Sequence, residues 1–281
     1  MKRRDFLKTL ALGAMAIGFA PDVLAETLKN PSSTLPEKFD DHLKDYLHKM
    51  EYFNSPHRND IQIDSIKYRT FKSVVMRLRR LQGYAGHGNF QILSLDDGIK
   101  MAWRSPDVGV FTKTEIEFLE MIFYAEAAKY GFFGQKPLKK LTDSIRKKDV
   151  IKIPYSGNYL YRGAPFETYK KIRQQVGEEV LLTSGVRSVM KQFLLFLNKA
   201  YKNKGNLSLA SRSLAPPGYS YHGIGDFDVG QTGFGSLNFT ERFTNTEVYR
   251  KLCDLGYLKL RYPEKNLAGV RFEPWHIKVN T

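Results

Sequence analysis

The stretch RFEPWHIKV, residues 271–279, places a glutamate and a histidine three positions apart, with a proline and a tryptophan between them. Histidine can bind zinc and a nearby carboxylate can act as a general base, so Glu273 and His276 suit zinc-dependent hydrolysis. The same residues would also suit an edge strand with one satisfied imidazole ring. In an unbroken strand the two side chains would point to opposite faces, so Pro274 predicts a kink that re-aims them. Further ligands elsewhere in the chain must decide between these interpretations.

Any metal in this chain must be held by His, Asp or Glu. Cys253 is the only cysteine of the 281 residues, which excludes an intramolecular disulfide and a zinc site built from thiolates. Three further segments carry polar residues that suit a site, in this order along the chain: SGVRSVMKQ at 184–192, YSYHGIGDFDVG at 219–230 and LRYP at 260–263.

With the Glu-Pro-Trp-His stretch, these segments resemble the VanY-type D-alanyl-D-alanine carboxypeptidases, zinc peptidases of the cell wall that share a core with the hedgehog signalling fold. In that family a Ser-Gly-Tyr-Arg-Ser turn precedes a helix, a Ser-x-His loop leads to an aspartate, and a Glu-x-Trp-His strand ends the site. Each motif has a counterpart here. The resemblance covers the C-terminal part of the chain and does not explain the helical part before it.

The resemblance implies a role for five residues. His222, Asp228 and His276 correspond to the zinc ligands. Three protein ligands leave one position open for water, which distinguishes a catalytic zinc from a structural one. Glu273 corresponds to the general base, which takes a proton from the zinc-activated water and passes it to the leaving amine. Arg187 corresponds to the arginine that holds the substrate carbonyl oxygen as negative charge develops.

Four other residues are expected near the substrate. Gln192 matches a glutamine of the family, and Ser184, Ser220 and Trp275 are expected to shape the pocket. For Trp275 the stronger expectation is packing, because an indole between two site residues buries a large apolar area with or without a substrate.

The spacing of the aspartate departs from the family pattern. The family usually has six residues between the ligand histidine and the aspartate, whereas five residues separate His222 from Asp228, and a count of six reaches Val229, which cannot bind zinc. A deletion inside a strand would turn the side chain to the wrong face, so we expect the missing residue in the turn at 223–225. Asp226 has the same strand parity and stays open as an alternative to Asp228, which is favoured because an apolar residue follows it.

The first 25 residues have the layout of a secretory signal peptide. Arg3 and Arg4 precede an apolar run from Thr9 to Ala20, and cleavage is expected after Ala25. The paired arginines resemble a twin-arginine signal, which implies the twin-arginine export machinery as a partner. The apolar run is about half of the roughly 20 residues needed to span a bilayer, so we expect no stable membrane span after cleavage. The predicted location is periplasmic or otherwise exported.

The chain is strongly basic, with 44 Lys and Arg against 29 Asp and Glu and a formal net charge of +15. Such a surface suits an acidic polymer, and for an exported protein the carboxylates of the cell wall are the natural partner. We therefore expect peptidoglycan or its peptide fragments as partners and no nucleic acid.

Apolar periodicity and turn residues divide the mature chain into three parts. They are an extended leader at 26–37, a helical region at 38–165 and a C-terminal domain at 166–281. The predicted fold class is α+β, with a small antiparallel sheet in the C-terminal domain, and the resemblance implies a core of the hedgehog and D-Ala-D-Ala peptidase type.

Local patterns predict the individual elements. Helices are expected at 39–50, 66–81, 114–130, 165–176, 187–205 and 245–255, with a capping box formed by Thr114 and Glu117. Strands are expected at 179–184, 206–212, 257–263 and 270–279, and the glycine-rich stretch 83–98 is expected to be a turn-rich connection.

The sequence thus predicts an exported zinc-dependent peptidase of the D,D-carboxypeptidase type that acts on peptidoglycan stem peptides. Two alternatives stay open: a wall-binding protein that keeps the fold and its zinc without cleaving, and an endopeptidase that cuts cross-links with the same chemistry. The presence of both Glu273 and Arg187 favours an enzyme, because a binding module needs neither a base nor a group that holds an oxyanion.

Overall fold

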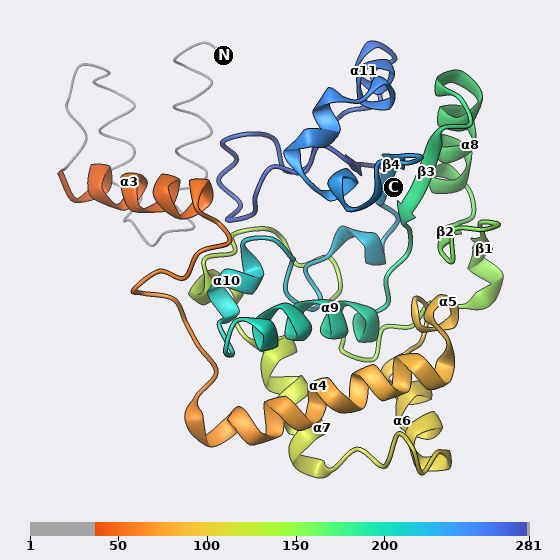
Figure 1. Ribbon diagram of the computed structural model, residues 1–281. Helices are drawn as coiled ribbons and strands as arrows, with labels where there is room; N and C mark the ends of the chain where they lie inside the picture. The colour runs from red at the N-terminus through yellow and green to blue at the C-terminus, as the bar shows by residue number, and fades with distance from the viewer. Residues whose placement is uncertain (1–36, 280–281) are drawn as a thin grey trace.

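The computed structural model describes residues 37–279 of the chain, with side chains from residue 44 onward. The predicted signal peptide at 1–25 and the leader up to residue 36 lie outside the described residues. None of the described helices is both long and apolar enough to cross a membrane. Figure 1 shows a helical part at the bottom of the view and, above it, a small sheet with further helices.

Five helices form most of the region before residue 125. They are α3 (Glu37–Glu51), α4 (Ser65–Ala85), α5 (His87–Phe90), α6 (Leu95–Arg104) and α7 (Lys113–Tyr124). The carboxylate of Asp64 caps α4 by accepting a hydrogen bond from the backbone N–H of Ile66. The apolar stripe of α4 is fully buried, as its helical spacing predicts, and consists of Phe71, Val74, Val75, Leu78 and Leu81.

Two predictions about this region are wrong. The capping box of α7 is formed by Thr112 and Glu115, not by Thr114 and Glu117, because the carboxylate of Glu115 accepts the N–H of Thr112 and also binds Arg77. The predicted helix also ends early: α7 stops at Tyr124, and a 3-10 turn, η1 (Ala127–Tyr130), follows.

The glycine-rich stretch 83–98 is not simply a turn-rich connection. The helix α4 continues to Ala85, and α5 and the start of α6 take up most of the remaining residues. Ser94 makes the start of α6 possible, since its hydroxyl accepts a hydrogen bond from the N–H of Asp97.

A hairpin leads from the helical region to the C-terminal domain. Its strands are β1 (Val150–Lys152) and β2 (Tyr159–Tyr161), preceded by the 3-10 turn η2 (Lys147–Asp149). The helix α8 (Ala164–Val176) follows, and Pro165 stands in its first turn, where a missing N–H costs no hydrogen bond.

The site is built around a three-stranded antiparallel sheet. Its strands are β3 (Val180–Ser184), β4 (Phe227–Gln231) and β5 (His276–Ile277), in the order β3-β4-β5. The register pairs Asp228 on the central strand with Ser184 on one side and with His276 on the other. The predicted α+β class with a small antiparallel sheet is confirmed.

The other elements of the domain are helices and turns. They are α9 (Val189–Lys202), α10 (Leu207–Ser211), η3 (Tyr221–Gly223), η4 (Gly235–Phe239), η5 (Glu241–Asn245) and α11 (Glu247–Asp254). The predicted strand at 206–212 is wrong: Asn206 caps α10 by accepting the N–H of Leu209, and all five residues of α10 are buried. The alternation of polar and apolar residues in this segment therefore does not correspond to one exposed and one buried face.

The predicted strands at 257–263 and 270–279 are also largely wrong. No strand is assigned to the first, and only His276 and Ile277 of the second pair with β4. Pro274 and Trp275 form a turn, closed by a hydrogen bond of 3.3 Å from the N–H of His276 to the carbonyl of Glu273. This turn is the kink that Pro274 predicts.

Two main apolar cores lie on either side of the site. One surrounds α4 and α7, and the other lies between the sheet, α8 and α11. The helix α9 crosses the middle of the molecule and buries Val189, Phe193 and Phe196 in the first core (Figure 1). The helical N-terminal region thus supports a helix that begins at the site itself.

Candidate metal centre and active site

Three side chains from separate elements meet at the sheet: His222 from η3, Asp228 from β4 and His276 from β5. Each offers one ligand atom, and these atoms all lie within 4.8 Å of one another. The Oδ1 atom of Asp228 is 3.3 Å from Nε2 of His222 and 3.1 Å from Nδ1 of His276. Two ligands about 2.0–2.1 Å from one tetrahedral zinc ion lie roughly 3.4 Å apart, so this spacing suits zinc.

The hydrogen bonding of Asp228 tests whether a cation fits. Its Oδ2 accepts a hydrogen bond of 2.8 Å from Nη2 of Arg187, whereas the buried Oδ1 accepts none from the described residues. A buried carboxylate oxygen without a donor is costly, and a metal ion placed between Oδ1 and the two imidazole nitrogens would satisfy it. The donor set of two imidazoles and one carboxylate therefore fits zinc.

The outer ring nitrogens of both histidines are held by neighbouring oxygens. Nδ1 of His222 lies 2.8 Å from the carbonyl oxygen of Gly185, and Nε2 of His276 lies 2.9 Å from Oδ2 of Asp226. Histidines that bind metals use their second nitrogen in this way, which fixes the ring orientation. Nε2 of His222 and Nδ1 of His276 are consequently the nitrogens that face the centre.

The two rival aspartates occupy different places. Asp228 belongs to the group of three, whereas Asp226 lies behind His276 and is held by Nε of Arg261 at 2.6 Å and by the N–H of Val279 at 3.0 Å. The geometry therefore favours Asp228 as the ligand and Asp226 as the residue that orients His276.

The turn between His222 and the strand is tight, as the short spacing predicts. Gly225 has a φ of 128°, a conformation that side chains disfavour, and the N–H of Asp226 bonds back to the carbonyl of Tyr221. A Cβ atom on Gly223 would lie 2.6 Å from the side chain of Leu138. This turn ends before β4 begins, and the strand pairs Asp228 with His276.

Burial and charge set the protonation of the centre. Burial alone would raise the pKa of Asp228, but His222, His276 and Arg187 outweigh it and hold that pKa well below its usual range. Burial would lower the pKa of His276, but the hydrogen bond to Asp226 and the charges of Asp226 and Asp228 raise it to about 9. A metal ion must displace that proton, so metal binding is expected to strengthen as the pH rises.

Glu273 lies beside the centre, with Oε2 3.9 Å from Nδ1 of His276. Burial raises the pKa of Glu273 to about 7, although the charge of His276 opposes the shift. A carboxyl group with such a pKa can accept and return a proton near neutral pH, which is what a general base requires. Its N–H donates to the carbonyl of Tyr262, which anchors this end of the chain.

Arg187 is fixed next to the centre by two oxygens. Its Nε donates to Oγ of Ser184 at 2.9 Å, and its Nη2 donates to Asp228. Ser184 was expected to shape the pocket, but it lies behind Arg187 and is not among the residues that line the cleft. Its role in the structure is to hold the guanidinium.

A cleft opens over the centre and contains most of the predicted residues. Ser220 and Trp275 line it, as expected. Gln192 does not: it is buried, and its Nε2 donates to the carbonyl oxygen of Ala215, a residue of the cleft wall. The lining residues are Arg187, Ser213, Leu214, Ala215, Ser220, Tyr221, His222, Asp228, Phe239, Tyr262, Val270, Arg271, Glu273, Trp275 and His276.

Sequence reasoning missed Arg261 and Arg271. Arg261 belongs to the LRYP segment, which had no assigned role, and its guanidinium holds Asp226 while its Cζ lies 3.3 Å from the centroid of the Tyr221 ring. Arg271 lies two residues before Glu273 and lines the cleft. Its position next to the Glu-Pro-Trp-His stretch was the only available signal.

Comparison with protein-family models gives a match to the same segment of the chain that carries the site. The family model of VanY, D-alanyl-D-alanine carboxypeptidase, matches residues 164–280. This segment is a VanY domain. It contains every residue to which the sequence assigns a role in the site, whereas the helical region before it lies outside the match.

The chain is also similar to several solved structures. The LdcB LD-carboxypeptidase shares 22% identity over 48% of this chain and 69% of its own, with a TM-score of 0.40. A mutant of the vancomycin-resistance D,D-pentapeptidase VanY in complex with Zn(II) shares 26% identity over 46% of this chain and 77% of its own, with a TM-score of 0.36. VanYB in complex with D-alanine-D-alanine shares 26% identity over 46% of this chain and 76% of its own, with a TM-score of 0.36. No curated protein sequence matched the chain.

Proposed function

We propose that this protein is a zinc-dependent carboxypeptidase that shortens peptidoglycan stem peptides. The observation that carries the proposal is the buried group of His222, Asp228 and His276, with the Oδ1 of Asp228 lacking a donor among the described residues, at the base of a cleft that also holds Glu273. The VanY match supports the choice of carboxypeptidase chemistry and of a peptide that ends in D-alanine.

The residues around the centre would each have a separate role in amide hydrolysis. A bound zinc ion would lower the pKa of a water molecule and polarise the scissile carbonyl. Glu273 would take the proton of the attacking water and deliver it to the leaving amine, a role that suits its pKa of about 7. Arg187, held rigid by Ser184 and Asp228, would present its guanidinium to the negative charge that develops on the carbonyl oxygen.

The location is part of the proposal and depends on the sequence alone. Residues 1–25 carry the twin-arginine-type signal, and we infer that the mature protein begins after Ala25 in the periplasm or another exported compartment. N-terminal sequencing of the protein recovered from its cells tests this inference. A chain that still begins at Met1 would contradict it.

The activity can be tested with the purified mature chain and defined muropeptides. Two kinds of peptide are incubated with zinc-loaded protein: peptides that end in D-Ala-D-Ala, and peptides in which a single terminal D-Ala follows a residue linked through an L-configured centre. The products are followed by mass spectrometry. We expect release of the terminal residue, and loss of that release after treatment with a chelator. The substrate that is cleaved decides between D,D and L,D specificity.

Two other outcomes would contradict the proposal. Zinc binding without cleavage of any peptide would indicate a wall-binding protein that keeps the centre. Cleavage only inside cross-linked peptides would indicate an endopeptidase with the same chemistry.

A further inference from the structure

Arg271 is a cation of the cleft without a polar partner in the described part of the chain. Its side chain lines the cleft beside Glu273, yet its guanidinium makes no hydrogen bond or ion pair with any described residue. Its Nε is buried and lacks an acceptor. Arg187 is the other Lys or Arg of the lining, and it is already bound to Asp228. Arg271 is therefore the cation of this cleft that is free to bind a ligand.

Aromatic rings hold the guanidinium of Arg271 in place. Its Cζ lies 4.8 Å from the centroid of the Trp275 ring and 5.2 Å from that of the Phe53 ring. Stacking of this kind orients the planar group and leaves its N–H edge available for hydrogen bonds. Trp275 belongs to the VanY domain, whereas Phe53 comes from the chain before it.

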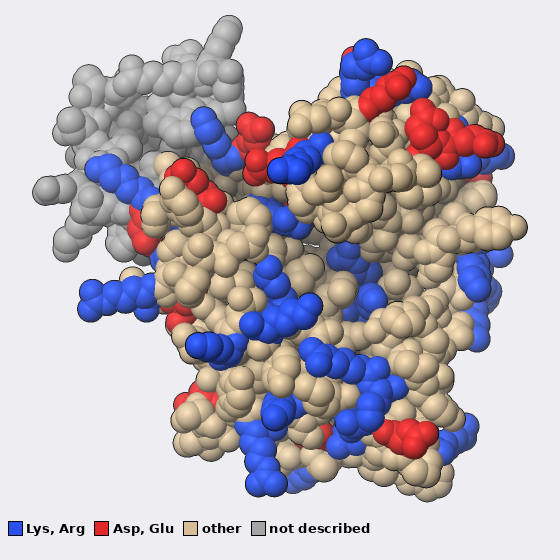
Figure 2. Space-filling model, viewed as in Figure 1, with Lys and Arg blue, Asp and Glu red and all other residues tan. Residues whose placement is uncertain are grey.

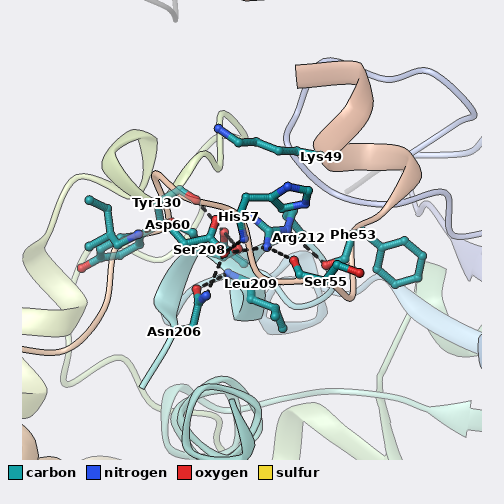
Figure 3. Close-up of polar contacts among 12 residues, drawn as sticks. Lys49, Phe53, Ser55, His57, Asp60, Tyr130, Asn206, Ser208, Leu209 and Arg212 are labelled. Carbon is teal, nitrogen blue, oxygen red and sulfur yellow. Dashed lines mark hydrogen bonds and ion pairs between the residues drawn. The ribbon is translucent and has the colours of Figure 1, made fainter. Parts of the chain in front are cut away.

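A buried ion pair fixes the surroundings of this stack. Arg212 makes two hydrogen bonds, of 2.7 and 3.0 Å, with the carboxylate of Asp60 (Figure 3). Its Nε donates to the carbonyl of Phe53, and its Nη2 also donates to the carbonyl of Ser55. The carbonyl of Arg212 in turn accepts the backbone N–H of Arg271 at 2.9 Å. Phe53 and Arg271 are thus both tied to Arg212, which makes the stack a rigid part of the structure.

The charges of three carboxylates, those of Glu273, Asp228 and Glu241, act on Arg271, but none of these groups forms an ion pair or hydrogen bond with it. Asp60 neutralises Arg212 through an ion pair, whereas Lys199 donates to the neutral side-chain oxygen of Asn54. Burial and the charges of Arg271, Lys202 and Arg212 lower the pKa of Lys199, and burial lowers that of Arg271. Figure 2 shows one face of the molecule, on which Lys and Arg side chains gather around a central hollow. A buried, rigid guanidinium without a paired anion is costly unless a ligand supplies one.

We propose that Arg271 recognises a carboxylate of the peptide substrate, through two parallel N–H···O hydrogen bonds. A planar guanidinium with free N–H groups matches a carboxylate in this geometry. The proposal rests on the proposed function, since it specifies which substrates that same cleft accepts. The carboxylate belongs either to the C-terminal residue that is released or to an acidic side chain nearer the N-terminus of the peptide.

Substrate amidation tests this recognition without altering the protein. Three peptides are compared on the wild-type holoenzyme: the parent, one with an amidated C-terminus, and one with amidated side-chain carboxylates. We expect amidation of the recognised carboxylate to raise KM about 10- to 100-fold, the range for hydrogen bonds to charged groups. The peptide that shows the rise identifies the source of the carboxylate.

Variants of Arg271 then assign the effect to this residue. Arg271→Gln is expected to raise KM for the parent peptide by the same factor and to have little further effect on the peptide whose recognised carboxylate is amidated. Arg271→Lys should recover part of the loss. Arg250→Gln, at an exposed arginine on α11, is the control and should leave KM unchanged.

Binding measurements separate recognition from turnover. Calorimetry with the zinc-loaded Glu273→Gln variant, with and without Arg271→Gln, should show the same loss of affinity for the parent peptide. If the wild-type enzyme cleaves all three peptides with equal KM, the proposal about Arg271 is overturned while the proposed function stands. If it cleaves none of them, the proposed function itself fails.

Discussion

At the scale of single residues, two aspartates that are two positions apart in the sequence make different contacts in the site. Asp228 places Oδ1 between His222 and His276, whereas Asp226 binds the far side of the His276 ring. The central strand keeps Asp228 in register with both neighbouring strands, and the turn before it leaves Asp226 outside the centre. One carboxylate is thus suited to bind the metal and the other to orient a ligand.

This division predicts different losses of zinc affinity. Asp228→Asn should remove a ligand charge and abolish tight binding, whereas Asp226→Asn should weaken binding about 10- to 100-fold, as expected for the partner of a ligand histidine. Competition with a chelating dye measures both, with Asp254→Asn on the exposed end of α11 as the control. A larger loss for Asp226→Asn than for Asp228→Asn would show that Asp226 is the ligand.

Glu273 gives a second prediction at this scale. Glu273→Gln keeps the shape of the side chain but cannot accept a proton, so zinc should stay bound while kcat falls about 10²- to 10⁴-fold. The base works in its ionised form and burial raises its pKa, so wild-type activity should decline as the pH falls through the pKa of Glu273. A pH profile of kcat/KM checks the sign, and undiminished activity of the variant would remove Glu273 from this role.

At the scale of elements, the connection between β3 and α9 controls the geometry of the centre. Gly185 stands in this connection, its carbonyl binds Nδ1 of His222, and the next N–H, of Val186, donates to the carbonyl of Tyr159 on β2. A Cβ atom on Gly185 would lie 2.0 Å from that same carbonyl oxygen. The hairpin β1-β2 therefore packs so closely that only glycine fits.

Gly185→Ala should disturb both the hairpin and His222. We expect a loss of about 1–3 kcal/mol in the free energy of unfolding, together with weaker zinc binding. Gly83→Ala is the matched control, because a Cβ atom at this exposed position of α4 would meet nothing within 4 Å, and it should stabilise by about 0.5–1 kcal/mol. Urea denaturation measures both, and equal stability of the two variants would contradict the packing argument.

At the scale of the whole molecule, the helical region and the VanY domain share both a core and a buried ion pair. The helix α9 packs into the core of α4 and α7, and Arg212 binds Asp60 across the join. Both side chains of this pair are nearly inaccessible to solvent, at 5% and 2% exposed. The region before residue 164 therefore supports the cleft and contributes Phe53 next to it.

Asp60→Asn should destabilise the whole protein by about 3–5 kcal/mol, because it leaves the charge of Arg212 buried without its partner. Burial opposes the shift, but Arg212 and other donors lower the pKa of Asp60 to about 2. The pair therefore stabilises the fold above about pH 4, and this contribution is lost as the pH falls toward 2.

Thermal denaturation across this pH range tests the prediction. Wild-type stability should fall more steeply between pH 4 and 2 than that of Asp60→Asn. Asp45→Asn is the control, since Asp45 forms an exposed pair with Lys49 and such pairs contribute at most about 1 kcal/mol. If Asp60→Asn and Asp45→Asn lost similar amounts of stability, burial of the Asp60–Arg212 pair would not increase its contribution to stability.

The sequence by itself determined which residues could carry the chemistry and where the longest helices lie. Only His, Asp and Glu could hold a metal in a chain with one cysteine, and their motifs appear in an order typical of one family. Apolar spacing also located α4, α8, α9 and β3, because a helix or strand with one buried face repeats that face in its own sequence. These properties depend on residue type and on neighbours along the chain.

Only the tertiary structure decided which of these residues meet. The choice between Asp226 and Asp228, the displacement of Gln192 from the cleft and the stack around Arg271 all depend on segments far apart in the sequence. The segment 206–212, predicted as a strand, contains α10 instead, and all five residues of α10 are buried. Its alternation of polar and apolar residues therefore did not distinguish a buried face from an exposed one. Local periodicity reports one face of one element, whereas a site requires the register between elements, and packing and hydrogen bonds set that register.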